Sequence, residues 1–148
     1  MKKFIFSSLF LLLMNFVHPE PKNVSKIDLL KEMFQKMVVN KDASLIPYYY
    51  AKDLILYSNG NKENYAEFYD SHKKYYQTPI QYQIKFDDNA TIENNNKVAA
   101  RIFITTKLPN QPPQLIEVLL IAEYKDNKIS KAWEVTDPDW SKMKAFKK

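Results

Sequence analysis

The chain has 148 residues, a formal net charge of +5, 45% hydrophobic residues, no cysteine and a single glycine. This length suits one ordinary domain with a hydrophobic core. The basic residues are scattered and almost all lysine, which excludes the clustered basic surface of a nucleic-acid-binding protein. The absence of cysteine excludes disulfides, and a lone Gly60 excludes glycine-rich phosphate-binding loops.

The first 22 residues have the order of a secretory signal peptide. Lys2 and Lys3 precede an uncharged, mostly apolar run over residues 4–17, which is too short to cross a bilayer comfortably. We therefore expect an exported protein, periplasmic or secreted, with one domain over residues 23–148. Residues 17–21 lack the small side chains that signal peptidase prefers, so an uncleaved tether is the alternative. That tether would be the only contact with a membrane.

Three segments with helical spacing follow. A first helix is expected at about 25–40, where Ser25 and Asp28 have the spacing of a capping box. A short second helix is expected through residues 45–46, and a third at about 61–76. The apolar stripe of the first helix consists of Ile27, Leu30, Phe34, Met37 and Val38.

From residue 80 onward the apolar period changes to two, which predicts antiparallel strands with one buried face. A shorter strand is expected before the third helix. The expected strands lie at about 53–58, 80–93, 97–108, 114–125 and 128–137, with tight turns at Asn59-Gly60 and Asp126-Asn127.

The last turn sets a register for the final two strands. With Asp126-Asn127 in the turn, Trp133 lies opposite Leu120, and Asp137 lies opposite Ile116. These four side chains then belong to the apolar face that the helices cover.

The opposite, outer face of the sheet is mixed in character. Arg101 is expected to pair diagonally with Glu123 there. Because a sheet that is apolar on both faces needs a second cover, we expect a homodimer through this outer face. The apolar side chains at its centre are Phe103, Leu119 and Ile121.

The order of these elements resembles the NTF2-like, or SnoaL-like, cone fold. The resemblance spans about residues 25–140 and depends on the first helix, on the strand and turn over 54–60, and on the ending over 128–137. It implies an α+β domain with three N-terminal helices packed on a curved antiparallel β-sheet. The family includes isomerases, cyclases, dehydratases, small-ligand binders and non-enzymatic modules, so the fold does not choose the chemistry.

Four residues are candidates for binding a ligand: Tyr57, His72, Trp133 and Asp137. In isomerase-like relatives the resemblance puts a carboxylate base three residues before the turn glycine, where this chain has Tyr57, a poor base but a good hydrogen-bond donor. His72 on the apolar face of the third helix is more often a core histidine than a catalytic one. Asp137 can line the cone or cap the turn that follows it. Trp133 can belong to the core or line a cavity.

Asp88 has two interpretations. If its strand continues without interruption, Asp88 faces the core opposite Ile102 as a buried carboxylate. A bulge at Asp87-Asp88 would instead turn both side chains to solvent, and this is the more ordinary outcome.

Two functional hypotheses remain, and no catalytic residue is assigned to either. The first is a pocket protein that binds, and can transform, a small apolar molecule; the second is a non-catalytic dimerising interaction module of the cell envelope. With one histidine after the signal, no cysteine and no acidic cluster, neither a metal site nor a cofactor is expected.

Overall fold

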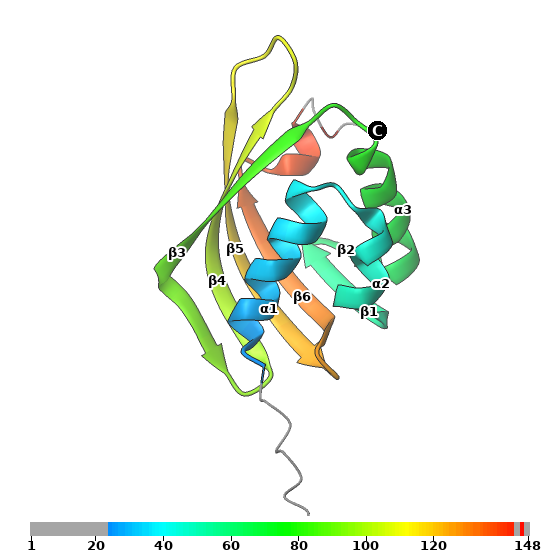
Figure 1. Ribbon diagram of the computed structural model, residues 1–148, viewed down its shortest axis with the longest axis vertical. Coiled ribbons are helices and arrows are strands. Elements are labelled where there is room, and N and C mark those ends of the chain that lie inside the picture. Colours follow the sequence, from blue (N-terminus) through cyan, green and yellow to red (C-terminus); the bar gives the residue numbers. More distant parts are fainter. Residues whose placement is uncertain (1–23, 144–145, 147–148) are drawn as a thin grey trace, which may run out of the picture.

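The computed structural model describes residues 24–143 and 146, so the expected signal peptide lies outside the described residues. Three helical segments cover the concave face of one bent β-sheet (Figure 1). No helix within the described ranges is long and apolar enough to span a membrane. The elements in chain order are α1 (Lys26–Met33), η1 (Phe34–Val39), η2 (Ala43–Leu45), α2 (Ile46–Tyr49), β1 (Tyr50–Ser58), β2 (Asn61–Asn64), α3 (Tyr65–Tyr76), β3 (Gln81–Asn94), β4 (Lys97–Lys107), β5 (Gln114–Lys125), β6 (Lys128–Asp137) and η3 (Trp140–Lys142).

The helices agree with the expected segments, with two differences at their ends. The first helix begins at Lys26 and is capped by Ser25, whose hydroxyl accepts a hydrogen bond from the Asp28 amide. Its last six residues, η1, are a π-helical segment. The third helix begins at Tyr65 and not at residue 61, because residues 61–64 pair with β1 as a short strand. Asn64 then caps the helix in a reciprocal pair with Glu67.

The sheet is mixed, which corrects the expectation of an antiparallel sheet throughout. Its strand order is β2-β1-β6-β5-β4-β3, and β1 runs parallel to β6. The other neighbouring pairs are antiparallel hairpins. The parallel pair brings the end of β1 beside β6, so that Ser58 lies opposite Glu134 although 76 residues separate them.

A bulge bends β3 where two acidic residues occur, which confirms the bulge interpretation of Asp88. The register shifts between Phe86 and Thr91, and the strand changes direction sharply at the sheet edge (Figure 1). Asp88 is exposed and pairs with Lys31 of α1 at 2.7 Å. It is therefore not a buried carboxylate.

A second bulge, in β6, determines which side chains of that strand face inward. Tyr124 pairs with Ile129 as expected, but Glu123 pairs with Lys131, which leaves Ser130 as an extra residue in β6. The Ser130 hydroxyl donates to the Glu123 carbonyl at 3.3 Å and so satisfies a group that the bulge frees from the ladder.

The prediction that Trp133 and Asp137 lie on the face covered by the helices is therefore wrong. Beyond Ser130 every residue of β6 is turned to the opposite face, because side chains in a strand alternate. Trp133 lies opposite Ile121 and Asp137 opposite Glu117, both on the outer face, whereas Glu134 and Thr136 turn inward.

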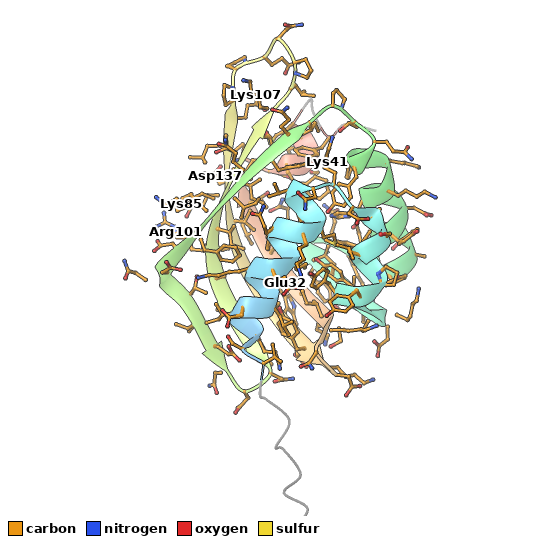
Figure 2. The ribbon with its side chains drawn as sticks, viewed as in Figure 1. Glu32, Lys41, Lys85, Arg101, Lys107 and Asp137 are labelled. Atoms are coloured by element: carbon orange, nitrogen blue, oxygen red, sulfur yellow. The ribbon has the colours of Figure 1, made fainter. Side chains whose placement is uncertain are left out.

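The outer face is mixed, as expected, although its ion pairs differ. Arg101 donates to Glu117 at 2.7 Å and to Asp87 at 3.4 Å, while Glu123 pairs with Lys97 instead. Figure 2 shows Arg101 and Asp137 on the side of the sheet away from the helices. The large apolar side chains left exposed there include Leu115, Leu119, Ile121 and Val135.

Candidate functional site

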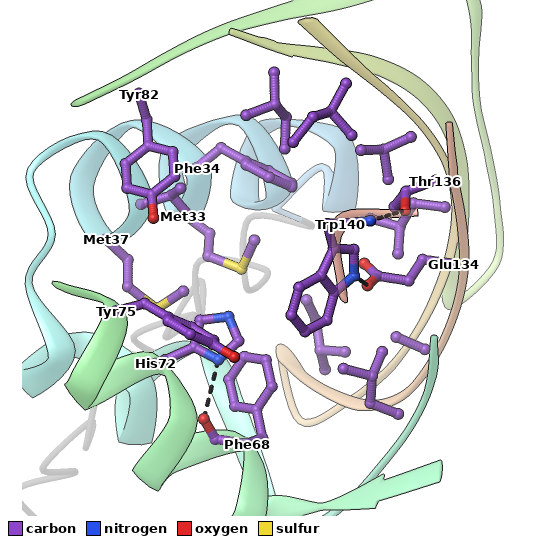
Figure 3. Close-up of a pocket in the computed structure, with 18 of the residues that line it drawn as sticks. Met33, Phe34, Met37, Phe68, His72, Tyr75, Tyr82, Glu134, Thr136 and Trp140 are labelled. Atoms are coloured by element: carbon purple, nitrogen blue, oxygen red, sulfur yellow. Dashed lines mark hydrogen bonds between the residues drawn. The ribbon is translucent and has the colours of Figure 1, made fainter. Parts of the chain in front are cut away.

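A cavity of about 150 Å³ lies between the concave face of the sheet and the helices. Figure 3 shows its interior, with methionines and aromatic rings of the helices on one side and Glu134 and Trp140 on the other. No lysine or arginine among the described residues lines it. The lining residues are Met33, Phe34, Met37, Val38, Tyr50, Leu56, Phe68, His72, Tyr75, Tyr76, Tyr82, Ile104, Ile116, Val118, Leu120, Ile129, Ala132, Glu134, Thr136, Trp140 and Phe146.

Glu134 is the acidic side chain of this cavity. Its Oε1 accepts hydrogen bonds from the Ser58 hydroxyl at 2.6 Å and from the Trp140 indole at 3.3 Å. Burial raises the pKa of the Glu134 carboxyl above its usual range against these two bonds, and the negative charge of Glu63 raises it further. The site therefore holds a carboxyl group whose burial favours the protonated form.

His72 lies across the cavity on α3 and is neutral at physiological pH. Its Nδ1 lies 3.0 Å from the carbonyl oxygen of Phe68, which can only accept, so Nδ1 carries the hydrogen. Burial lowers the pKa of His72 to about 4, although the bond to Phe68 favours the charged form. His72 can therefore contribute a neutral imidazole edge to the cavity.

Tyrosine hydroxyls supply the remaining polarity. Burial raises the pKa of Tyr82 to about 12, and that of Tyr50 lies well above 10 because of burial and nearby charges that include Glu134. The Tyr76 hydroxyl is buried with no hydrogen-bond partner among the described atoms, which is costly. All three are un-ionised donors at neutral pH.

The structure places one of the four predicted ligand residues at this cavity, namely His72. Tyr57 and Trp133 lie on the other face of the sheet, where their rings stack 6.1 Å apart. Asp137 is exposed at the end of β6, and Asp139 is the residue that caps the following turn, by accepting from the Ser141 amide. The prediction that these residues bind a ligand stays a prediction, but three of them do not share the cavity with His72.

Sequence reasoning missed Glu134, Ser58 and Trp140. A register counted from the Asp126-Asn127 turn without a bulge puts Glu134 on the outer face. A spacing of three between Ile129 and Ala132, both apolar and buried, was the available signal, because an uninterrupted strand would put them on opposite faces. Ser58 and Trp140 reach the site only through the parallel pairing of β1 and β6 and the turn after β6.

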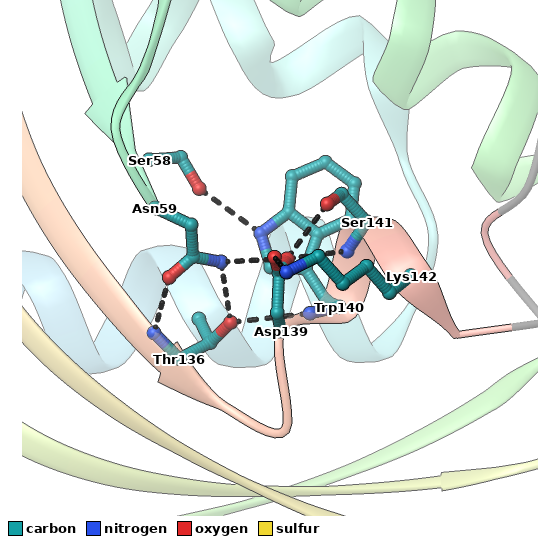
Figure 4. Close-up of polar contacts among 7 residues, drawn as sticks. All are labelled: Ser58, Asn59, Thr136, Asp139, Trp140, Ser141 and Lys142. Atoms are coloured by element: carbon teal, nitrogen blue, oxygen red, sulfur yellow. Dashed lines mark hydrogen bonds and ion pairs between the residues drawn. The ribbon is translucent and has the colours of Figure 1, made fainter.

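Asn59 fixes the polar wall behind Glu134 (Figure 4). Its side-chain amide donates to the Thr136 hydroxyl at 2.8 Å and to Asp139 at 3.0 Å, and its oxygen accepts from the Thr136 amide at 2.8 Å. The Thr136 hydroxyl in turn accepts from the Trp140 amide. These bonds connect the β1–β2 turn to η3 and so hold the Trp140 indole against Glu134.

The described residues offer no group of three or more histidine, cysteine or acidic side chains that could hold a metal ion. The lining of the cavity is mainly apolar, with the Glu134 carboxyl as its one acidic group among the described residues.

Comparison with solved structures shows that the chain has the NTF2-like fold. IdmH from Streptomyces antibioticus, named as a candidate polyketide cyclase, superimposes with a TM-score of 0.64 at 13% identity, over 78% of this chain and 94% of IdmH. An LEH-like epoxide hydrolase from M. tuberculosis gives a TM-score of 0.65 at 12% identity, over 82% of this chain and 88% of its own.

An NTF2-like protein of unknown function from Cytophaga hutchinsonii gives a TM-score of 0.58 at 13% identity, over 78% of this chain and 92% of its own. No protein-family model matches the sequence, and no curated protein matches it in sequence. At these identities the likeness establishes the fold, and the chemistry has to be argued from the site.

Replacing Asn59 tests the polar wall. Asn59→Ala removes three side-chain hydrogen bonds and puts an alanine at a φ of 46°, so we expect a loss of about 2–3 kcal/mol in the free energy of unfolding, measured with urea. Asn59→Gly tolerates that φ and should lose less. Asn61→Ala, at an exposed position of the same hairpin, is the control. A loss for Asn59→Ala no larger than that of the control would contradict the assignment.

Titration of His72 gives a pH dependence with a defined sign. The folded pKa of about 4 lies below the unfolded value of 6.5, so the contribution of His72 is complete above about pH 6.5 and is lost as the pH falls toward 4. At pH 5 the loss should be about 2 kcal/mol relative to pH 7. In the His72→Gln variant, the free energy of unfolding measured with urea should fall less between pH 7 and pH 5. An equal fall in the wild type and the variant would show that His72 is not desolvated.

Proposed function

We propose that the protein binds a small, mainly apolar molecule in the interior cavity, with Glu134 contacting the polar end of that molecule. The observation that carries the proposal is a single desolvated carboxyl group in an otherwise apolar and aromatic cavity. Burying an ionisable group costs stability, and ionisable groups whose pKa is shifted by burial in a cavity concentrate at functional sites.

The cavity volume limits the size of the ligand. Drug-sized ligands occupy pockets of about 300–1,000 Å³, whereas this cavity measures about 150 Å³. An engineered void of about that size in another protein takes up benzene. We therefore propose a ligand of about one ring.

A ligand panel tests this function. We expect benzene-sized compounds to raise the melting temperature of the wild type. Ala132→Leu fills the cavity beside Glu134 and should abolish the shift. Ala99→Leu makes the same substitution in β4, whose Ala99 lies on the outer face opposite Ile121, and should keep it. The proposal would be overturned if the compounds also raise the melting temperature of Ala132→Leu, or if no compound raises that of the wild type.

We also propose that the outer face of the sheet forms a homodimer. Leu119, Ile121 and Val135 are 54%, 46% and 61% exposed there, which is unusual for neighbouring apolar side chains in the middle of a sheet. Charges of both signs surround them, including Arg101 and Glu117, so the face can pair with a second copy of itself about a two-fold axis.

Sedimentation velocity tests the dimer. We expect wild-type protein to sediment as a dimer at high concentration, and Leu119→Glu to sediment as a monomer because the charge would be buried at the interface. Tyr48→Glu, at a 59% exposed residue of α2 on the helix side, should remain dimeric. A strictly monomeric wild type would contradict the proposal.

Export of the chain through its first 22 residues is likewise a proposal, supported by Lys2, Lys3 and the apolar run over 4–17. N-terminal sequencing of protein from the cell envelope and from the medium should find a new N-terminus near residue 22. Full-length protein retained in the cytoplasm would contradict export, whereas an intact Met1 in the membrane fraction would favour the tether.

A further inference from the structure

Among the described lining residues of the cavity there is one acidic side chain and no basic side chain that is charged at pH 7. Glu134 can carry a negative charge, while His72 with a pKa of about 4 is neutral at pH 7 and the lining tyrosines are un-ionised. No described lysine or arginine lines the cavity to balance a carboxylate. The negative charge of Glu63 in β2 also raises the pKa of Glu134.

Only one of the two oxygens of the Glu134 carboxyl group accepts hydrogen bonds from the described residues. Both donors, the Ser58 hydroxyl and the Trp140 indole, bind Oε1 and are neutral groups. Within the described part of the chain, Oε2 accepts no hydrogen bond and Glu134 takes part in no ion pair, whereas seven ion pairs elsewhere occupy other acids. Burial favours the protonated form of the Glu134 carboxyl, and one positive charge in the cavity would stabilise its carboxylate form instead.

Aromatic rings surround the place where that charge would lie. The ring centroid of Trp140 lies 6.1 Å from that of Tyr75 and 5.8 Å from that of Phe146. All three residues line the same cavity as Glu134. Figure 3 shows the Trp140 ring beside the Glu134 carboxylate, with the Tyr75 ring across the cavity from it. The faces of aromatic rings attract organic cations, and the attraction is strongest where water is excluded.

We propose that the ligand of this cavity is a small organic amine that binds as its ammonium ion, with the charged nitrogen on Glu134 and the apolar body between the sheet and α1. This inference rests on the proposed binding function and specifies its ligand class. An amine of about one ring satisfies the volume, the lack of a counter-charge among the described lining residues and the aromatic wall together. A neutral apolar compound would satisfy only the volume, and a carboxylate ligand would be repelled by the carboxylate form of Glu134.

Isosteric probes separate this inference from the binding function. Benzylamine, benzyl alcohol, toluene and benzoate differ mainly in the polar end, and their affinities can be measured by calorimetry at pH 7. For the wild type we expect benzylamine to bind at least tenfold more tightly than benzyl alcohol or toluene, and benzoate to bind most weakly. Ala132→Leu should abolish binding of all four probes.

Two variants test whether the preference for benzylamine depends on Glu134. Glu134→Gln keeps an oxygen that can accept from Ser58 and Trp140 while it removes the charge, so the ratio of benzylamine to benzyl alcohol affinities should fall to about one. Glu117→Gln removes a carboxylate from the outer face and should leave the ratio unchanged. The wild-type ratio decides the question even if Glu134→Gln does not fold.

The outcomes are distinguishable. Equal affinities for benzylamine and the neutral probes would overturn the amine inference and leave the cavity as a binding site. A preference for the amine that survives Glu134→Gln, or a preference for benzoate, would overturn it as well. No binding of any probe to the wild type would overturn both the inference and the proposed function.

Discussion

The structure of the site depends on one extra residue in β6. Ser130 interrupts the pairing of β5 with β6 and bonds to the Glu123 carbonyl, which turns the rest of the strand over. Without that bulge, Trp133 would face the helices and Glu134 would face the outer side. The bulge therefore places a small alanine, a carboxylate and a threonine, and not two bulky side chains, against the interior. Because these inward side chains are less bulky, a cavity remains between the sheet and the helices.

The carboxylate that the bulge turns inward is held by parts of the chain that lie far apart in sequence. Ser58 comes from β1 through the only parallel pairing of the described sheet, and Trp140 comes from the turn after β6. Asn59 connects the two through Thr136 and Asp139. A polar group at this depth does not contribute to stability as an apolar side chain would, and here an organised set of donors offsets part of the cost of burying it.

Much of the fold could be predicted from the sequence, because the signals are local. The switch of apolar period near residue 80 and the turns at Asn59-Gly60 and Asp126-Asn127 located the strands, and both turns have the positive φ values that such short hairpins need. Asn61–Asn64 was read as helix because a strand of four polar residues has no periodic pattern.

The candidate site was less predictable, since it depends on a single residue of register and on a pairing between distant strands. Counting back from Asp126-Asn127 put Tyr124 opposite Ile129 correctly and then failed at Ser130, whose bulge leaves no mark in composition. The parallel pairing that brings Ser58 to Glu134 is likewise invisible to local patterns. His72 was found because a histidine on an apolar helix face is conspicuous in sequence.

The same bulge separates the two tryptophans of the chain by the thickness of the sheet. Trp140 lines the cavity with its indole nitrogen on Ser58, whereas Trp133 lies on the outer face, stacked on Tyr57 and within 5.4 Å of the Lys131 ammonium. The protein thus carries two tryptophan fluorophores, one on each side of the sheet. Emission from Trp140 reports on the interior, and emission from Trp133 reports on whatever covers the exterior, so single-tryptophan versions would read the two surfaces independently in the same molecule.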